Sequence, residues 1–356
     1  MPLCAHSWND QTRLSMSVCT GETMAIVYRR IETIDEYRAV ENLQAQVWGS
    51  EARDVVPLHL LLTANKNGGL ALGAFDPNLT PPGDLIGFVF GFVGLTAAGQ
   101  VKHCSHMLGV LPHYRDRGIG EELKRRQRDF AFAQGITLMT WTFDPLQSRN
   151  ARLNLRKLGA ICRTYARNLY GTMSDRLNAG VPSDRFEVEW HLASRHVEAR
   201  LARAEPEPDL AALLAEGVLV LNPASPGAAD DAPAPVCRDP SGARVLIRFP
   251  TDIQTLKMTR PAEALTWRMQ VRDLCERSFA AGHAVTSVAP AITAGIMTSE
   301  SEIGPEVKVR NRTSTGCGFC TPNSTSITES TVIRMNMNTR MGCLIQCLYQ
   351  SGAILS

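Results

Sequence analysis

The chain has 356 residues, of which 44% are hydrophobic and 20% are charged, a balance typical of globular proteins with two or three domains. Its formal net charge of +2 argues against a chain that is basic throughout, as many nucleic-acid-binding proteins are. There is no run of about 18 apolar residues and no apolar signal-peptide core, so we expect a cytoplasmic protein that does not span a membrane.

Strands and helices alternate through the first half of the chain. Residues 1–23 are polar and lack periodicity, so we expect a disordered extension there. Hydrophobic periodicity, caps and glycine turns predict strands at 25–31, 70–75, 85–95, 101–111, 137–143, 161–167 and 186–192. They predict helices at 33–48, 58–65, 119–134 and 148–158. This order indicates the α/β class, and we assign residues 24–196 to one domain.

The composition changes after this domain. Residues 197–290 predict a smaller α/β segment, with helices at 197–216 and 261–281 and strands at 218–222, 243–249 and 284–288. Residues 291–356 are rich in Ser and Thr and show little periodicity, so we expect a disordered tail. Its cysteines are spaced tolerably for a zinc site, but no ribbon or finger pattern surrounds them, and we expect no metal. These cysteines are Cys317, Cys320, Cys343 and Cys347.

The stretch from Ser105 to Lys124 contains the motif that is most informative about function. A strand leads into Arg115-Asp116-Arg117-Gly118-Ile119-Gly120, and a helix starts at once. The glycines let the backbone approach a ligand closely, while the first helical N–H groups and the helix dipole favour an anion. This predicts a phosphate or pyrophosphate site, with a purely structural glycine turn as the alternative. The dinucleotide fingerprint Gly-x-Gly-x-x-Gly and the Gly-Lys-Ser/Thr of P-loops are both absent.

This strand, Arg-x-x-Gly-x-Gly turn and helix resemble the acyl-CoA-binding motif of the GNAT acetyltransferase superfamily. The stretches 141–151 and 154–160 resemble the next GNAT strand and helix. With Arg163-Thr164-Tyr165 and residues 184–190, the chain is similar over about residues 24–290 to a little-characterised family of predicted GNAT acetyltransferases. The resemblance implies the GNAT fold, a mixed, mostly antiparallel sheet flanked by helices. It also implies acetyl-CoA or another acyl-CoA as co-substrate.

The resemblance further implies where the acyl-CoA lies. The ligand would occupy a V between the strands at 101–111 and 137–143, with backbone groups near Leu108 and Val110 binding the pantetheine arm. The pyrophosphate would be held by Arg115, Arg117, Gly118 and Gly120. Asn150 and Asn154 lie where the family has its second CoA-binding helix.

Direct transfer to an amine needs a base for the ammonium and an acid for the leaving thiolate. Many GNAT enzymes place a Tyr acid on the second helix, where this chain has Asn154-Leu155. Tyr165 is our candidate for that role, and Tyr170 or water are the alternatives.

Two histidines are candidates for the base. His103 and His106 lie on the strand that would face the acyl group, and strand alternation allows only one of them to point into the site. We prefer His106 because simple alternation places it on the same face as Leu108. Asp144 and Arg149 follow the end of the next strand and are candidates for binding the acceptor, with the cofactor phosphate as another partner for Arg149.

The sequence leaves the acceptor open between a small-molecule amine and an amine of a peptide or protein. The missing helix Tyr keeps a non-catalytic acyl-CoA-binding or sensor protein as the alternative function. A weaker hypothesis is a nucleic-acid-associated regulator, based on the basic run Lys124, Arg125, Arg126 and Arg128. Because Glu121, Glu122 and Asp129 flank this run, we expect a solvated helix face instead.

Overall fold

The computed structural model describes residues 25–49, 54–173, 175, 178–204, 206, 209–225, 232–289 and 294–300. The predicted extension at 1–23, the four clustered cysteines and most of the predicted tail therefore lie outside the described residues. The strands are β1 (Val27–Arg30), β2 (Leu70–Phe75), β3 (Leu85–Leu95), β4 (Val101–Val110), β5 (Leu138–Phe143), β6 (Ile161–Ala166), β7 (Arg185–His191), β8 (Leu219–Val220), β9 (Arg244–Pro250), β10 (Ala284–Ala289) and β11 (Ala294–Glu300).

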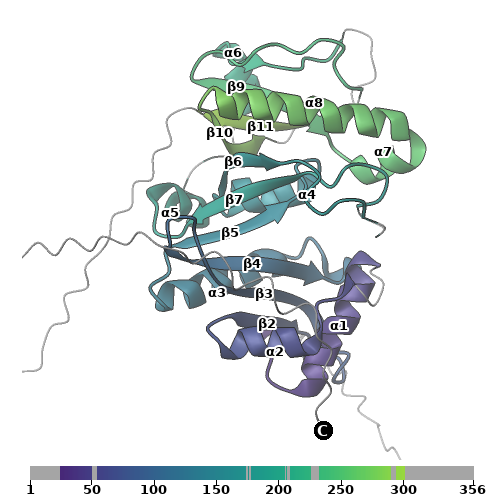
Figure 1. Ribbon diagram of the computed structural model, residues 1–356, viewed down its shortest axis with the longest axis vertical. Coiled ribbons are helices and arrows are strands. Elements are labelled where there is room, and N and C mark those ends of the chain that lie inside the picture. The colour runs from purple at the N-terminus through teal and green to yellow at the C-terminus, as the bar shows by residue number, and fades with distance from the viewer. Residues whose placement is uncertain are drawn as a thin grey trace, which may run out of the picture. The chain divides into compact units, whose positions relative to one another are not determined.

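Helices separate and cover these strands (Figure 1). They are α1 (Ile34–Trp48), α2 (Leu58–Lys66), α3 (Ile119–Ala133), α4 (Ser148–Ala151), α5 (Arg195–Leu201), α6 (Leu210–Ala215), α7 (Ile253–Thr259) and α8 (Pro261–Ala280), with a 3-10 turn at Pro112–Tyr114 and a π-helical segment at Arg152–Lys157. Thr33 caps α1, because its hydroxyl accepts the Glu36 N–H while the Glu36 carboxylate accepts the Thr33 N–H. Among the helices in the described ranges, none is both long and apolar enough to cross a membrane.

The described strands form one eleven-stranded sheet, and their order is β1-β2-β3-β4-β5-β7-β6-β10-β11-β9-β8. In this part of the chain the pairs β4–β5 and β8–β9 are parallel and the other pairs are antiparallel. The sheet is therefore mixed and mostly antiparallel, which confirms the predicted fold class.

Two hydrophobic cores meet along α3. One core joins α1 and α2 to strands β1–β4, and the other joins β5–β7 and β9–β11 to the helices that follow β5. Ile119 and Leu123 of α3 belong to the first core, whereas Ala131 belongs to the second. Helix α3 therefore packs across the boundary between β4 and β5, where the predicted cofactor site lies.

The C-terminal segment extends this sheet. Strand β10 pairs with β6 through Val285 and Cys162, and α8 packs on the C-terminal strands (Figure 1). Strand β11 lies in the range 291–356, where the sequence predicted only a tail. It forms because it lies between β10 and β9 and pairs with both, and such long-range pairing leaves no mark in local composition. The proposed division at residue 196 stays a prediction.

Candidate functional site

The strands β4 and β5 separate soon after they meet. They pair at His103–Met139 and at Cys104–Thr140, whereas β5 pairs with β7 along its whole length. Beyond Cys104 and Thr140, the remaining halves of β4 and β5 therefore border an opening in the sheet. This is the place where the resemblance puts the acyl-CoA.

A bulge in β4 lies at the narrow end of this opening. Phe90 of β3 is opposite Met107, but the next residue, Gly91, is opposite Ser105, so His106 is the extra residue of the bulge. An extra residue shifts the alternation of side chains between the two faces of the sheet by one position.

The bulge overturns one prediction about His106. Ser105 donates a hydrogen bond to Gln127 of α3 at 2.8 Å, and Leu108 also faces α3, where a Cβ on Gly120 would lie 3.7 Å from it. His106 points to the opposite face. It was predicted to share a face with Leu108 because simple alternation was assumed, and the bulge between Ser105 and Met107 removes that assumption.

On its own face, His106 lies beside aromatic rings. Its ring centroid is 6.1 Å from that of Phe90 and 6.0 Å from that of Phe92. Desolvation lowers the pKa of His106, which keeps the imidazole neutral around pH 7. The other histidine, His103, is buried on the α3 face, where burial and then Lys124 lower its pKa to about 4.

The edge of β4 that borders the opening presents backbone groups. The Leu111 N–H donates to the Ile86 carbonyl of β3 at 2.9 Å. Backbone groups of successive residues point to alternate sides of a strand, so those of Val110 and Leu108 point away from β3, toward the opening. Both residues are therefore placed to bind amide groups of a pantetheine arm.

The glycine turn after β4 has the shape of an anion site. Gly118 adopts the left-handed conformation, with φ of 82°, as the N-cap of α3, and no side chain caps the helix there. The first N–H to bond back into the helix is that of Glu122, which reaches the Gly118 carbonyl at 3.0 Å. The preceding N–H groups are thus directed out of the helix start, and the space beside Gly118 is open.

Arginines surround this turn. The Arg115 Nε donates to the Val110 carbonyl at 3.1 Å, and the Arg117 guanidinium lies 5.1 Å from the Tyr114 ring centroid. Arg149 of α4 forms an ion pair of 3.1 Å with Asp116 in the turn. Arg149, expected to bind an acceptor or a phosphate, therefore lies beside the glycine turn.

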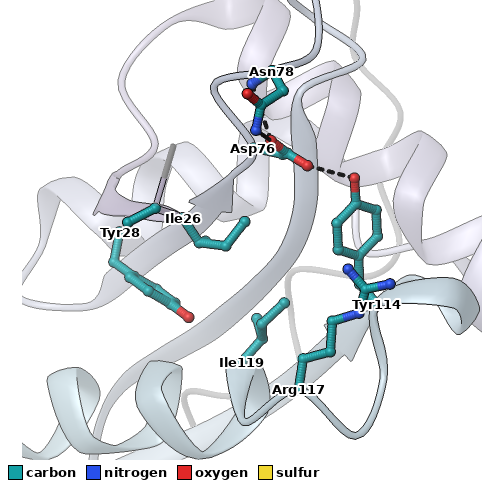
Figure 2. A pocket seen from close by; sticks show the side chains of 8 residues that line it. Ile26, Tyr28, Asp76, Asn78, Tyr114, Arg117 and Ile119 are labelled. Atoms are coloured by element: carbon teal, nitrogen blue, oxygen red, sulfur yellow. Dashed lines mark hydrogen bonds between the residues drawn. The ribbon is translucent and has the colours of Figure 1, made fainter. Parts of the chain in front are cut away.

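A pocket of ≈ 290 Å³ adjoins the turn (Figure 2). The Tyr114 hydroxyl donates to the Asp76 carboxylate at 2.6 Å across one side of it, and this bond is the main cause that lowers the pKa of Asp76. The pocket thus combines aromatic surface with a cationic group next to the anion site. Its lining residues are Ala25, Ile26, Tyr28, Asp76, Asn78, Tyr114, Arg117 and Ile119.

The second predicted CoA helix is short and continues as a π-helical segment. The Leu158 N–H donates to the Leu153 carbonyl, five residues back, at 3.0 Å. Asn150 is exposed on α4, whereas Asn154 is buried in the π segment. Lys157 forms a 3.0 Å ion pair with Glu121 in the first turn of α3, which holds this segment against the anion site.

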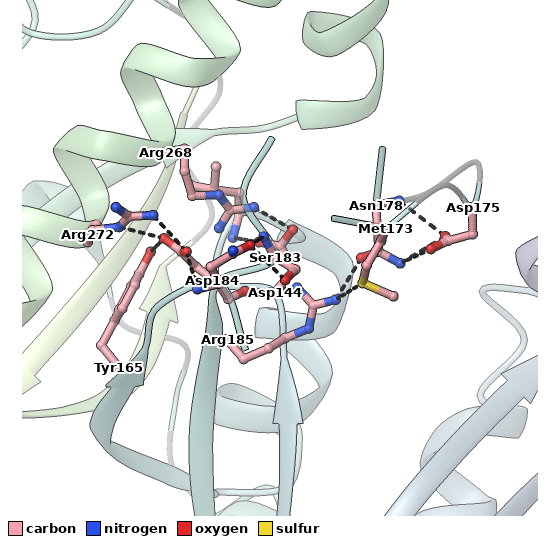
Figure 3. A network of polar contacts seen from close by, with 12 residues as sticks. Asp144, Tyr165, Met173, Asp175, Asn178, Ser183, Asp184, Arg185, Arg268 and Arg272 are labelled. Carbon is pink, nitrogen blue, oxygen red and sulfur yellow. Dashed lines mark hydrogen bonds and ion pairs between the residues drawn. The ribbon is translucent and has the colours of Figure 1, made fainter. Parts of the chain in front are cut away.

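Tyr165, the predicted acid, lies elsewhere (Figure 3). Its hydroxyl donates to the Asp184 carboxylate at 2.9 Å, and burial is the main cause that raises its pKa. Arg272 of α8 donates two bonds of 2.8 Å to the same carboxylate. Because β5 and β7 separate β6 from β4, the structure does not bring Tyr165 and His106 together. The sequence could not show this, since Tyr165 and Arg272 are far apart in the chain.

Asp144, a predicted acceptor-binding residue, has structural partners. It is 8% exposed and accepts a 2.7 Å hydrogen bond from the fully buried Arg268 of α8. Its other oxygen accepts the Leu146 N–H at 2.9 Å. The carboxylate therefore holds α8 and the turn after β5 in place, and is not open to an incoming acceptor (Figure 3).

Polar residues cover the face of β5 opposite α3. Phe92 is opposite Cys104, and Cys104 is opposite Thr140, so His106 shares its face with Thr140 and Thr142. Thr142 Oγ1 lies 2.9 Å from the Tyr170 hydroxyl. The alternative tyrosine is thus at the open side of the site.

The same face carries two carboxylates that the sequence analysis missed. Glu187 and Glu189 of β7 lie opposite Thr142 and Thr140. Glu189 pairs with His191 at 3.0 Å, whereas no cation pairs with the exposed Glu187 in the described part of the chain. The acidic residue at every second position of 186–190 was the available signal.

The basic run on α3 divides into two parts. Arg126 is exposed and pairs with Glu122 at 2.7 Å, as expected of a solvated helix face. Arg125 and Arg128 are half-buried and bond to the distant carbonyls of Leu201 at 2.9 Å and Leu192 at 2.6 Å, so they also anchor α3 to the segment after β7.

Lys124 instead points inward and is 2% exposed, so its assignment to the solvated face was wrong. The helical spacing of Gly120, Lys124, Gln127 and Ala131, which places all four on one side of α3, was the signal that could have found it. Among the described residues, no group of three His, Cys, Asp or Glu side chains could hold a metal ion.

The glycine turn at the start of α3 lies beneath two separating strands, the arrangement that the resemblance to the GNAT superfamily implies for an acyl-CoA-dependent acyltransferase. Residues 43–160 match the model of the acetyltransferase (GNAT) family. This stretch of the chain is accordingly a GNAT acetyltransferase domain. No curated protein matches the sequence.

Several solved structures are similar to about half of the chain. A chain of the NatC complex bound to Gag peptide and CoA is 18% identical, with a TM-score of 0.39, and covers 47% of this chain and 99% of its own. Ard1 from Thermoplasma volcanium is 14% identical, with a TM-score of 0.35, and covers 47% and 97%. Arabidopsis thaliana NAA60 in complex with acetyl-CoA is 17% identical, with a TM-score of 0.36, and covers 47% and 99%. These are distant likenesses, and the family assignment rests on the sequence match.

Proposed function

We propose that the protein transfers the acetyl group of acetyl-CoA, or a related acyl group, directly to the nitrogen of an amine. The observation that carries this proposal is the separation of β4 and β5 above the start of α3. This separation places the proposed phosphate site and the unpaired edge of β4 close enough together for one ligand to bind both. The proposed CoA-binding residues are Leu108, Val110, Arg115, Arg117, Gly118, Gly120, Arg149, Asn150 and Asn154.

The acceptor is proposed to approach from the face opposite α3. The carboxylates of Glu187 and Glu189 on that face favour a cationic amine. A small-molecule amine and an amine of a peptide or protein both fit this chemistry. His106 is proposed as the base, because a neutral imidazole can take the proton that the ammonium must lose before it attacks.

Calorimetric titration of the full chain with acetyl-CoA, and free CoA as the reference, tests the binding part of this proposal. Release of CoA thiol in the presence of a panel of amines tests the transfer. We expect His106→Ala to lower turnover by about 100-fold or more while acetyl-CoA affinity stays within about twofold. The matched control is His59→Ala, an exposed histidine of α2, which should leave both unchanged.

One observation favours the non-catalytic alternative. Tyr165 is bonded to Asp184, and Asn154 occupies the usual position of the helix Tyr, so a tyrosine acid is missing from both places. An acyl-CoA-binding or sensor protein would bind acetyl-CoA without releasing thiol with any acceptor. A cytoplasmic location belongs to both proposals.

A further inference from the structure

Lys124 is a buried cation without an anionic partner. Its Nζ donates to the Ser105 hydroxyl at 2.8 Å and lies 3.5 Å from the centroid of the Trp141 ring. No carboxylate pairs with it in the portion of the chain that the structure describes. Buried lysines are rare unless they are paired, and a negatively charged ligand would supply the partner that keeps this one charged.

The location of Lys124 identifies that ligand. Ser105 and Trp141 are the first residues beyond the last β4–β5 pair, Cys104–Thr140. The Lys124 amine therefore contacts both strands at the narrow end of the opening, on its α3 face. A molecule that enters between the strands and follows the edge of β4 would end beside this amine.

The length of CoA agrees with this position. From Val110, next to the anion site, to Ser105 is five residue steps of a strand, or roughly 16 Å. The pantetheine arm, with its two amides, is about as long as four extended residues, or roughly 14 Å. With the pyrophosphate at the glycine turn, the sulfur atom therefore arrives close to the Lys124 amine.

We propose that the amine of Lys124 binds the sulfur of CoA and stabilises it as the leaving thiolate; this rests on the proposed acyl-CoA function. The acceptor nitrogen attacks the thioester carbon, the C–N bond forms, and the C–S bond breaks with its electron pair going to sulfur. The Lys124 ammonium keeps its proton and pairs with this thiolate while CoA is bound. The proton that the acceptor nitrogen loses passes to the sulfur as CoA leaves, so the products are the amide and CoA thiol.

The surroundings of Lys124 suit this pairing. Burial lowers the pKa of Lys124 well below its usual range, and a thiolate beside the amine would favour its charged form. The Ser105 hydroxyl donates to Gln127, and Gln127 Nε2 is 3.2 Å from His103 Nε2, so the polar groups around the amine are held in fixed positions. None of these neighbours carries a negative charge that would compete with a thiolate. The arrangement stabilises the leaving thiolate, a role for which Tyr165 lies too far away in the sheet.

The test compares CoA with acetyl-CoA on the full-length protein, by calorimetry and by thiolate ultraviolet absorbance at pH 7. In the wild type we expect a thiolate signal from bound CoA and about tenfold tighter binding of CoA than of acetyl-CoA. Lys124→Met should abolish the signal and the preference while leaving acetyl-CoA affinity within about twofold. Lys66→Met, an exposed lysine of α2, is the matched control and should behave as the wild type.

Three outcomes are distinct. A thiolate signal and CoA preference that survive in Lys124→Met, or that are absent from a wild type that binds both ligands, would overturn the role of Lys124. A folded wild type that binds neither ligand would instead remove the proposed acyl-CoA function. Lys124→Gln provides a second variant if Lys124→Met does not fold, and the same losses are expected of it.

Discussion

Two basic side chains that are buried against the sheet, Arg268 and Lys124, differ in whether a carboxylate pairs with them. Arg268 of α8 is fully buried and is bonded to the Asp144 carboxylate at 2.7 Å. Lys124 of α3 is as deeply buried, but its partners are a hydroxyl and an aromatic ring. The Arg268 charge is paired inside the chain, although its Nε and Nη1 have no hydrogen-bond partner among the described residues, whereas Lys124 has no carboxylate partner there and can accept an anion from outside.

The paired region extends beyond Arg268. Asp184, which is fully buried, accepts hydrogen bonds from Arg272 of α8, from Tyr165 of β6 and from the Asn168 N–H (Figure 3). These bonds join the C-terminal helix to the strands β6 and β7. We infer that this network fixes the C-terminal segment on the sheet, while the Lys124 region is kept for a ligand.

The largest expected effect is a loss of stability when the buried ion pair of Asp184 and Arg272 is removed. Asp184→Ala leaves Arg272 and Tyr165 without their acceptor, and breaking such a buried pair should lower the free energy of unfolding by about 3–5 kcal/mol. Urea denaturation measures this change. Asp273→Ala is the matched control on the same helix, because Asp273 pairs with Arg277 at the surface and should cost less than about 1 kcal/mol. Equal losses in the two variants would contradict the distinction.

The second effect is a loss of acetyl-CoA affinity, and it concerns the glycine turn at the start of α3. Gly118→Val puts a branched side chain at a φ of 82° beside the proposed pyrophosphate, so acetyl-CoA affinity should fall by at least about tenfold. Gly99→Val, in the turn between β3 and β4, is the control because its φ of 77° carries the same backbone strain away from the site. Calorimetry should show normal affinity in that variant. Equal loss of binding in both would point to general destabilisation.

The turn around Gly118 could be predicted because its signal is local. A strand, two glycines, two arginines and a helix follow one another within about twenty residues, and backbone conformation at such a turn is set by neighbouring residues. The order of strands β1 to β7 along the chain was predictable for a similar reason, since hydrophobic periodicity marks each element, whereas the mixed sheet was predicted only from the resemblance to the GNAT superfamily. The sequence therefore located the glycine turn and the strands that border the opening.

Local patterns could not predict on which face of the sheet a site residue lies, or which distant residues it contacts. His106 was placed on the wrong face because the bulge depends on how β3 pairs with β4, which no local pattern records. Asp184, which binds Tyr165, and Asp144 bond to residues of α8 that are 88 and 124 positions away in the chain. Lys124 differs from these, because helical spacing alone places it beside Gln127 on the buried side of α3.

The third effect is a pH dependence of the free energy of unfolding, and its source is Asp184 in the paired region. Burial by itself would raise the pKa of the Asp184 carboxyl, but the hydrogen bonds from Arg272, Asn168 and Tyr165 outweigh it and the pKa is lowered. A lowered pKa in the folded state stabilises the protein above the unfolded-state pKa of about 3.9, and this contribution disappears as the pH falls below it. Urea denaturation between pH 6 and about pH 3 should therefore show a smaller acid loss of stability in Asp184→Asn than in the wild type. Identical slopes would count against a lowered pKa.

The smallest expected effect on stability comes from the unpaired cation. Lys124→Met replaces a buried charge with an apolar side chain of similar length, so no carboxylate loses a partner and the transfer of an ion from water is avoided. The lost bond to the Ser105 hydroxyl opposes this gain, and we expect the free energy of unfolding to change by less than about 1 kcal/mol.

Arg268→Met is the matched comparison, because the same kind of replacement there leaves Asp144 buried and unpaired and should cost about 3 kcal/mol or more. Urea denaturation of the two variants side by side measures the difference. If Lys124→Met were as costly as Arg268→Met, the lysine would be part of the structural framework. A small stability change together with a lost preference for CoA would instead assign the buried charge to the ligand, because a group that the fold does not need is then kept for what it binds.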